Sequence, residues 1–288
     1  MYKHNKLLIT VLFLIFTTSL VAQWNKGKGK GYYKLSLWSI KADQHYTDTG
    51  EIDPNTTRGT FNFNFYGEYG LGKKIDLITY IPFFTRTYQN NVLSGTRGNI
   101  TTEGATLNAF GDIDVAIRYG LLKKESLAIS TTLKLGLPTG NTTGGNEFAI
   151  LQTGDGEFNQ QLQVDLGYSF KLNTIPAYGK TFAGYNNRTK GFSDEINFGG
   201  EIGLLFFEKL WLIGKLNILK STKNGSITAS TANGSIFANN IEYTNIGAQI
   251  AYNIYKKVSI SYEYSSAING KLIAAAPSHS VGISLDIK

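Results

Sequence analysis

His279 and Ser280 are adjacent in the sequence, and they are the residue types from which a general base and a nucleophile are built. Adjacent residues of a β-strand point to opposite faces of the sheet, so these two side chains cannot meet as a catalytic pair. His45 is the one other histidine outside the N-terminal segment, and the polar stretch around it offers no fixed partner. The sequence therefore predicts a protein that is not an enzyme.

Metal, phosphate and cofactor sites are not predicted either. The chain has no Cys, so a site built from His and Cys ligands is not expected. Gly67, Gly72 and Lys73 match the spacing of a phosphate-binding loop, but Lys74 stands where a Ser or Thr would hold magnesium. Asp155 and Glu157 offer oxygen ligands for calcium, as do the acidic residues of 43–53. Neither stretch has the spacing of a calcium loop, so we expect solvated carboxylates.

The N-terminal residues have the layout of a secretory signal peptide. Lys3 and Lys6 precede the apolar run from Leu7 to Phe16, and Ala22 ends the segment before a polar stretch. This pattern predicts a signal peptide over 1–22. The glycine- and lysine-rich stretch that follows predicts a mobile periplasmic lead-in over 23–30, in preference to a binding site for an anionic partner.

Strict two-residue alternation of apolar and polar residues dominates the rest of the chain. Ile113, Val115 and Ile117 alternate with charged residues, and Leu162, Val164 and Leu166 alternate with polar ones. This period is typical of strands with one apolar and one polar face. We predict twelve strands: 31–41, 59–71, 74–87, 110–121, 126–138, 158–170, 175–188, 194–207, 210–221, 239–254, 257–267 and 278–288.

The connections between these strands alternate in length. Those at 71–74, 123–126, 171–174, 207–209 and 255–257 are tight, whereas 42–58, 88–109, 139–157, 222–238 and 268–277 are long. An even number of strands, with short turns at one end and long loops at the other, is typical of an outer-membrane β-barrel. A soluble exported β-sandwich would also alternate, but its connections would be of mixed length. The prediction is an all-β, antiparallel, up-and-down barrel over 31–288, in the cell outer membrane.

Residues 110–170 carry a resemblance to a known family. Gly111-Asp112 at a strand start, then Leu137-Pro138-Thr139-Gly140, then Gln152-Thr153-Gly154 resemble a family of outer-membrane transporters named for a phenol meta-cleavage degradation pathway. Gln152 departs from that family's pattern. The composition, rich in Asn, Lys and Ile, resembles outer-membrane proteins of Bacteroidota. The resemblance implies a transporter fold, and no binding residue of the family carries over.

The polar faces of the strands identify candidate residues for the lumen, because a membrane barrel turns its apolar face to lipid. Charges of both signs in a confined interior are expected to pair, since an unpaired charge there is costly. We expect Asp112, Asp114 and Arg118 to share one face and to form a compensated cluster with Lys134. The candidate lumen residues are Arg86, Asp112, Asp114, Arg118, Lys134, Asp165, Lys180, Glu201, Lys215 and Glu263.

Twelve strands enclose a lumen wider than that of eight-stranded barrels and narrower than that of sixteen-stranded porins. One hypothesis is a narrow channel or transporter for small solutes, including apolar or aromatic ones. The other is a barrel that does not transport and acts through its outer loops in adhesion, surface assembly or envelope structure. The expected partners are outer-membrane lipid and the barrel-assembly machinery. The net charge of +7 is spread along the chain, so a nucleic-acid partner is not expected.

Overall fold

The structure is a computed structural model, and it describes residues 25–145, 150–226 and 236–288. The predicted signal peptide lies outside the described residues. No helix among the described residues is long and apolar enough to cross a membrane.

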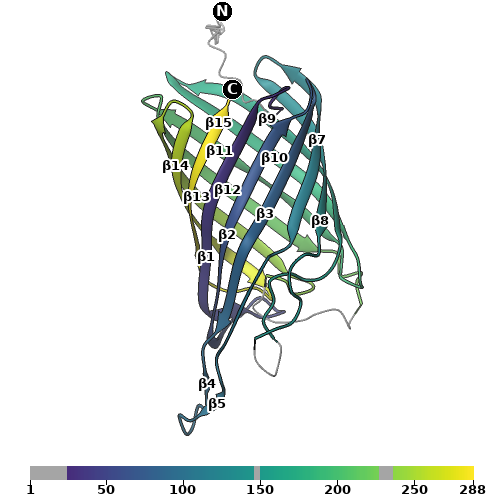
Figure 1. The fold of residues 1–288 in the computed structure, drawn as a ribbon, viewed down its shortest axis with the longest axis vertical. Helices are drawn as coiled ribbons and strands as arrows, with labels where there is room; N and C mark the ends of the chain where they lie inside the picture. The colour runs from purple at the N-terminus through teal and green to yellow at the C-terminus, as the bar shows by residue number, and fades with distance from the viewer. Residues whose placement is uncertain (1–24, 146–149, 227–235) are drawn as a thin grey trace, which may run out of the picture.

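The described residues form a closed antiparallel β-barrel with twelve wall positions (Figure 1). β6 and β7 occupy one wall position in succession, since both pair with β3. The wall strands are β1 (Gly31–Tyr46), β2 (Ile52–Gly70), β3 (Ile75–Gln89), β6 (Ala105–Ala109), β7 (Ile113–Lys124), β8 (Leu127–Leu137), β9 (Asn159–Leu172), β10 (Ile175–Arg188), β11 (Glu195–Phe206), β12 (Leu210–Ser221), β13 (Glu242–Tyr255), β14 (Val258–Lys271) and β15 (Ser278–Ile287).

The barrel closes where the first strand meets the last. β1 pairs with β15 in one continuous register, from Gly31 opposite Ile287 to Ile40 opposite Ser278. Every other wall strand pairs with its neighbours along the chain, so the topology is the simple up-and-down one. Closure satisfies the backbone groups that an edge strand would leave unpaired, which a membrane requires of any structure that crosses it.

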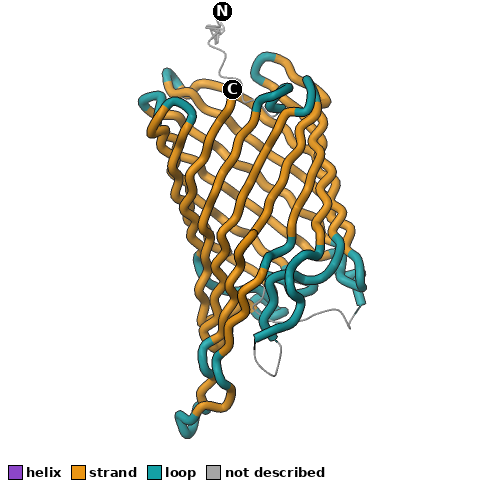
Figure 2. The backbone as a smooth tube through the Cα atoms, viewed as in Figure 1, coloured by secondary structure: helices purple, strands orange, loops and turns teal. Residues whose placement is uncertain are grey.

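The two ends of the barrel differ as the sequence predicts. Short turns and both described termini lie at one end, and the long connections lie at the other (Figure 2). In outer-membrane barrels the short turns are periplasmic, so we call these the periplasmic and outer ends. The turn between β11 and β12 places Phe207 and Glu208 at positive φ angles of 51° and 58°, which suits the right-handed twist of a tight hairpin.

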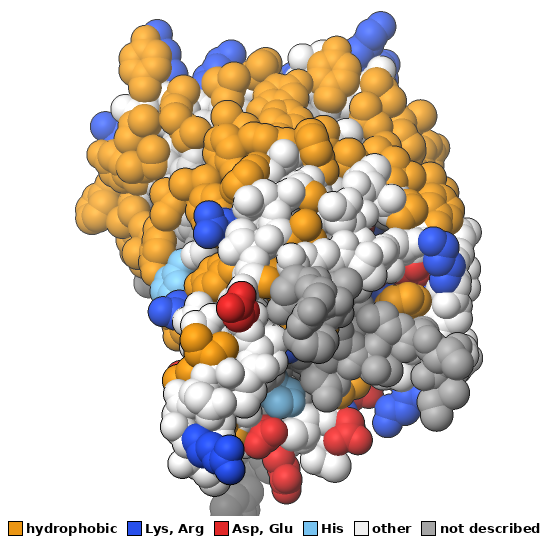
Figure 3. Space-filling model, turned by 60° about the horizontal axis from the view of Figure 1, so that its bottom comes forward, with side chains coloured by type: hydrophobic (Ala, Val, Ile, Leu, Met, Phe, Trp, Pro, Cys, Tyr) orange, Lys and Arg blue, Asp and Glu red, His pale blue; other side chains and the backbone are white. Residues whose placement is uncertain are grey.

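The outward face of the wall is apolar. Leu133, Leu162, Val164 and Ile260 are among the many large apolar side chains that are exposed there, and hydrophobic atoms cover the visible barrel wall (Figure 3). The same strands turn polar residues such as Gln161 inward, where they are buried. A barrel with an apolar outside and a polar inside is a membrane barrel, and the protein is placed in the outer membrane.

Three features at the outer end differ from the sequence prediction. The first long loop is mostly strand, because β1 and β2 continue past the expected boundary and meet in a hairpin at 47–51. The connection 88–109 contains β6 and a small projecting hairpin, β4 (Val92–Leu93) with β5 (Ile100–Thr102) (Figure 1). A register shift on β2 between Phe63 and Phe65, facing β3 between Ile81 and Phe84, inserts an extra residue into β3.

A small hydrophobic core lies inside the outer end of the barrel. Tyr46, Leu219, Ala238, Ile241 and Ile273 are buried against one another. They come from the ends of β1 and β12 and from segments beside β13 and β14. The loops on this side therefore pack into the mouth, where their apolar side chains are removed from water.

Candidate functional site

The middle of the lumen is lined by charges of both signs, and the sign alternates along the four consecutive strands β9 to β12. We call this set the lumen belt; it comprises Asp165 on β9, Lys180 on β10, Glu201 on β11, Lys215 on β12, Glu263 on β14 and Lys34 on β1. Lys180, Glu201 and Lys215 are directly opposite one another across three strands. Opposite charges at paired positions attract, so the belt stabilises its own arrangement.

The belt residues make close ion pairs, and all but the buried Asp165 of the paired side chains keep contact with water. Lys180 Nζ lies 3.5 Å from Asp165 Oδ1, and Lys215 Nζ lies 2.7 Å from Glu263 Oε2. Tyr178 donates a hydrogen bond of 3.1 Å to Glu201. The side chains of Lys215 and Glu263 remain 22% and 25% exposed. Because a positive and a negative side chain both remain exposed here, we infer that the lumen contains water at this depth, since removing charged groups from water is costly.

The periplasmic end holds a second, drier cluster around Arg118. Its guanidinium donates to Glu68 Oε2 and to Asp76 Oδ2, each at 2.8 Å. The Asp76 side chain is 0% exposed. Such charge-assisted contacts are among the stronger hydrogen bonds in proteins. The cluster joins β2, β3 and β7 at the inner wall.

The segment that precedes β1 docks onto this cluster. The backbone N–H of Lys26 donates to both carboxylate oxygens of Asp76 at 3.1 Å, and the Asn25 side chain donates to the same group at 3.2 Å. Lys26 Nζ lies 3.6 Å from Glu68. The prediction of a mobile lead-in is therefore wrong for the described residues from Asn25 onward, because buried carboxylates supply acceptors that hold them.

Glycines make room for this docked segment. A Cβ at Gly70 would overlap the backbone carbonyl of Gly27, and one at Gly120 would overlap the Asn25 side chain. The backbone also pairs locally, with Gly29 N donating to Gly70 O at 2.9 Å. The segment is thus fitted to the periplasmic opening by backbone contacts as well as by charge.

At the outer rim, Asp112 anchors the long connection between β8 and β9. Its carboxylate accepts hydrogen bonds from Gly140 N at 2.8 Å and Asp155 N at 3.0 Å. Thr139 donates to Gly111 O at 2.7 Å, and a Cβ at Gly154 would overlap the Asp112 carboxylate. The three motif elements that carry the family resemblance therefore meet in space, as positioning residues for a loop.

The same connection is held from its other side by Arg188. This guanidinium contacts Glu157 at 2.6 Å, Glu195 at 2.7 Å and Asp155 at 3.0 Å. The Glu157 side chain is 0% exposed, and burial raises its pKa although Arg188 pulls in the opposite direction. The expectation of solvated carboxylates at 155–157 is wrong, because the loop folds inward onto an arginine.

Asp194 completes the hydrogen-bonded surroundings of Arg188. It accepts from Arg188 N at 2.8 Å and from the side chains of Tyr185 and Asn224 at 2.7 Å each. Partial desolvation acts to raise the pKa of Asp194, but these hydrogen bonds together outweigh it and lower the pKa below its usual value. Three outer connections are thereby linked through charged groups.

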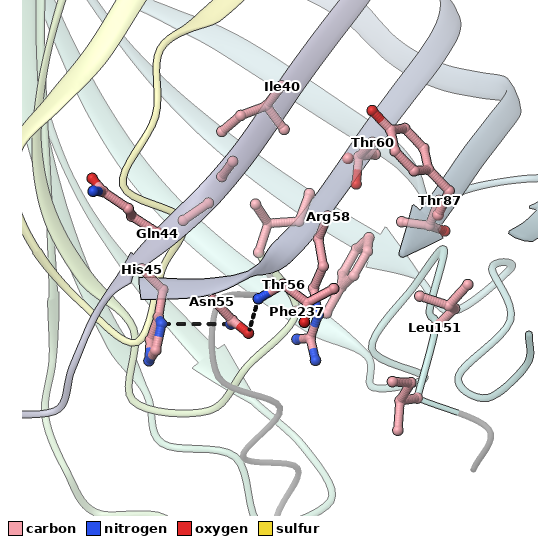
Figure 4. Close-up of a pocket in the computed structure, with 16 residues that line it drawn as sticks. Ile40, Gln44, His45, Asn55, Thr56, Arg58, Thr60, Thr87, Leu151 and Phe237 are labelled. Carbon is pink, nitrogen blue, oxygen red and sulfur yellow. Dashed lines mark hydrogen bonds between the residues drawn. The ribbon is translucent and has the colours of Figure 1, made fainter. Parts of the chain in front are cut away.

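Between these loops and the wall formed by β1, β2 and β3 lies a pocket, which we call the outer pocket (Figure 4). Its apolar lining comes from Ile40 and Ala42 on β1 and from Leu151 and Phe237 on the connections. Arg58 extends into this region from β2, and its Nε donates to Gln89 at 2.8 Å. Apolar and basic side chains thus lie side by side in this pocket.

The predicted lumen residues are distributed among these regions. Asp114 and Lys134 pair with each other at 3.5 Å, Arg118 joins the periplasmic cluster, and Asp112 anchors the rim. The single compensated cluster expected for Asp112, Asp114, Arg118 and Lys134 is therefore split in three. The structure places Asp165, Lys180, Glu201, Lys215 and Glu263 in the belt.

Arg86 lies on the outer face, which corrects its prediction as a lumen residue. It is exposed and pairs with Phe61, whereas its neighbour Thr85 is buried inside. The extra residue in β3 at Pro82–Phe83 reverses the facing of every later residue in that strand, as a bulge does. His279 accepts or donates a bond of 2.8 Å with Tyr262 on the neighbouring strand.

No family model matches this sequence, and no curated protein matches it. Solved structures do match. The COG4313 outer membrane channel from Pseudomonas putida F1 is 13% identical with a TM-score of 0.59, over 93% of this chain and 100% of that one. The NanC porin is 6% identical with a TM-score of 0.50, over 88% and 98%. The fold is that of an outer-membrane barrel. At these identities the likeness concerns the fold alone.

Proposed function

We propose that this barrel is a narrow channel or transporter for small solutes. The observation that carries the proposal is the lumen belt, in which the side chains of Lys180, Lys215 and Glu263 stay 26%, 22% and 25% exposed. A wall that only needed to be stable would fill this space with apolar side chains, since a buried ion pair is weak support for stability. A similar fold is named an outer membrane channel, which agrees with the proposal.

The docked N-terminal segment explains how such a channel is kept narrow. Residues 25–30 lie at the periplasmic opening, held by Asp76, Glu68 and the backbone of Gly70. A small solute passes when this segment shifts, and the belt then presents both charge signs to it. Apolar and aromatic solutes are included in the proposal because the outer pocket has an apolar lining.

The test uses a substitution that adds bulk beneath the docked N-terminal segment and changes no charge. Gly70→Ala places a methyl group against the carbonyl of Gly27, whereas Gly72→Ala is a matched control because a Cβ at Gly72 meets nothing within 4 Å. In planar bilayers we expect Gly70→Ala to conduct several-fold better than wild type, with Gly72→Ala unchanged. Silence of the wild type and of both variants under an ion gradient would contradict the transport proposal.

A second candidate function rests on the outer end. The β1–β2 hairpin and the β4–β5 hairpin project beyond the wall (Figure 1), and Leu93 and Ile100 are exposed there. These features favour a role in adhesion, surface assembly or envelope structure. Replacing residues 92–102 by a short turn would then abolish surface attachment while leaving conductance unchanged. Loss of conductance without loss of attachment would favour transport instead.

The family of this barrel and its partners are also proposed. The meeting of Gly111-Asp112, Thr139-Gly140 and Gly154 around one carboxylate supports the resemblance to the phenol meta-cleavage pathway family, because residues that hold one loop have a shared reason to occur together. Outer-membrane lipid is the proposed partner of the apolar wall, and the barrel-assembly machinery is the proposed partner of the unclosed chain.

A further inference from the structure

Lysines that are far apart in the sequence lie together at the periplasmic end of the barrel. The up-and-down topology brings every second connection to this end, and each of the five short turns has one or two lysines in it or beside it. Two carboxylates, Glu125 and Glu208, lie in the same turns, so eight lysines and two carboxylates give a net charge of +6. We call the lysines the basic rim; they are Lys73, Lys74, Lys123, Lys124, Lys171, Lys209, Lys256 and Lys257.

The basic rim is exposed, and the described residues do not neutralise it. All eight lysines are exposed, and the ion pairs of the described residues include none of them. By contrast, the inward-facing Arg118 and Lys215 each contact a carboxylate. Residues 1–24, which precede the described chain at this end, contain no Asp or Glu. The charge that balances the rim is therefore that of small ions or of another molecule.

Exposed aromatic side chains lie beside the same lysines. Lys74 Nζ lies 5.9 Å from the centre of the Tyr119 ring, and this ring is 42% exposed on the outward face of β7. Lys256 Nζ lies 5.7 Å from the centre of the Tyr255 ring, which is 66% exposed. Phe207, in the turn between β11 and β12, is 88% exposed. These contacts place ammonium groups at the outer perimeter of the barrel, away from the lumen.

This arrangement suits the headgroup layer of a membrane. Lys and Arg side chains stand along the upper edge of the barrel in Figure 3, above the apolar wall. Aromatic side chains of membrane proteins concentrate at the membrane–water interface, where neighbouring lysines extend their charged ends to the headgroups. A cluster of lysines at this depth is attracted to anionic lipids, since each ammonium group interacts favourably with a negative membrane surface.

We propose that the basic rim binds the phosphate groups of anionic phospholipids at the periplasmic surface of the membrane. The ammonium groups of Lys74 and Lys256 contact the phosphates, and Phe207 and Tyr255 lie against the adjoining part of the acyl chains. A soluble acidic polymer would also match the charge, but it would leave these aromatic side chains in water. The proposal concerns lipid at the rim and does not depend on whether solutes cross the lumen.

The experiment reconstitutes the full-length barrel in phosphatidylcholine vesicles and adds a trace of spin-labelled lipid. Electron spin resonance then measures how strongly spin-labelled phosphatidylglycerol associates with the protein relative to spin-labelled phosphatidylcholine with the same acyl chains. We expect phosphatidylglycerol to associate about twofold more strongly or better at low salt. The preference should shrink at high salt, where the screening length falls to about 3 Å. Replacing Lys73, Lys74, Lys256 and Lys257 together by Gln should remove roughly half of the preference, since half of the rim lysines are lost.

Two controls separate charge at the rim from other effects. Arg at the same four positions keeps the charge and should keep the preference. Arg97→Gln with Lys223→Gln removes two exposed cations from the outer end and should leave it unchanged. Equal association of the two lipids with the wild type, or an equal loss in the Gln and Arg variants, would overturn the proposal. Binding of soluble polyglutamate without any lipid preference would also overturn it and assign the rim to an acidic partner.

Lipid association is measured without an ion gradient, so its outcome is separate from that of the conductance test. A barrel that conducts nothing but prefers phosphatidylglycerol contradicts only the channel. A barrel that conducts and shows no preference contradicts only the basic rim.

Discussion

Arg118 at the periplasmic end and Arg188 at the outer end are both buried arginines surrounded by carboxylates. Around Arg118 the charges balance, because Lys26 adds a second cation to match Glu68 and Asp76. Around Arg188 they do not, since one guanidinium faces Asp155, Glu157 and Glu195. The first cluster joins three wall strands, whereas the second joins the wall to a loop.

This difference shows what each cluster can hold in place. The backbone pairing of β2, β3 and β7 fixes the carboxylates of the Arg118 cluster, so the cluster positions only the docked N-terminal segment. The carboxylates of 155–157 have no ladder to fix them, and they depend on Arg188, Thr189 and Asp112. A surplus of carboxylates makes the outer cluster more sensitive to loss of its cation and less sensitive to loss of an anion.

The largest expected effect is therefore that of Arg188→Met. It leaves three carboxylates facing one another, two of them well buried, and should lower the free energy of unfolding by about 3–5 kcal/mol. Urea unfolding in lipid vesicles would measure it. Lys220→Met is the control, because the Lys220 side chain is 49% exposed where it meets Glu242. A loss no larger than that of Lys220→Met would mean that Arg188 does not hold the loop.

A matched pair of neutralised carboxylates tests the charge balance. Glu68→Gln removes an anion from the balanced cluster and should cost about 1.5–3 kcal/mol, as the loss of a hydrogen bond to a charged group does. Asp155→Asn removes an anion from the surplus cluster and retains an oxygen that can accept from Glu157 N, so we expect a change of less than about 0.5 kcal/mol. Denaturation curves that place these costs in the opposite order would refute the comparison.

The smallest effect is expected at an exposed ion pair of the lumen that lies outside the belt. Lys134 and Asp114 form a pair with side chains 36% and 33% exposed, so Lys134→Met should change the free energy of unfolding by about 0–1 kcal/mol. The same denaturation experiment measures it. A cost above about 2 kcal/mol would show that this part of the lumen is dry, and would weaken the case for a channel.

Two-residue alternation was sufficient to predict the strands and the facing of most charged side chains. Lys180, Lys215 and Glu263 could be placed inside because their strands contain no irregularity near them. Arg86 could not be placed by alternation alone, because one extra residue near Pro82 reverses the facing. The consecutive apolar residues Phe83 and Phe84, directly after a proline, are the mark of this bulge in the sequence. The two-residue period predicts which face of the sheet a side chain takes only where the strand pairing is regular.

The contacts of the charged groups were not predictable in the same way. Arg118 contacts Glu68 and Asp76 because of the register between neighbouring strands of the barrel. The sequence of one strand does not determine that register. Arg188 meets Glu157 because a loop folds inward, and loops have no period to read. The adjacency of Asp155, Gly156 and Glu157 beside a Thr-Gly pair was the one available signal, and it is equally typical of a solvated turn.

The pairing of β1 with β15 has a consequence for how the molecule is made. Until β15 has paired with both of its neighbours, β1 and β14 each present an unpaired edge. Ring closure joins residues from opposite ends of the chain, the slowest kind of contact to form. Residues 278–287 thus close the cylinder on both of its edges, and a chain that lacks them would be an open sheet prone to pair with other chains.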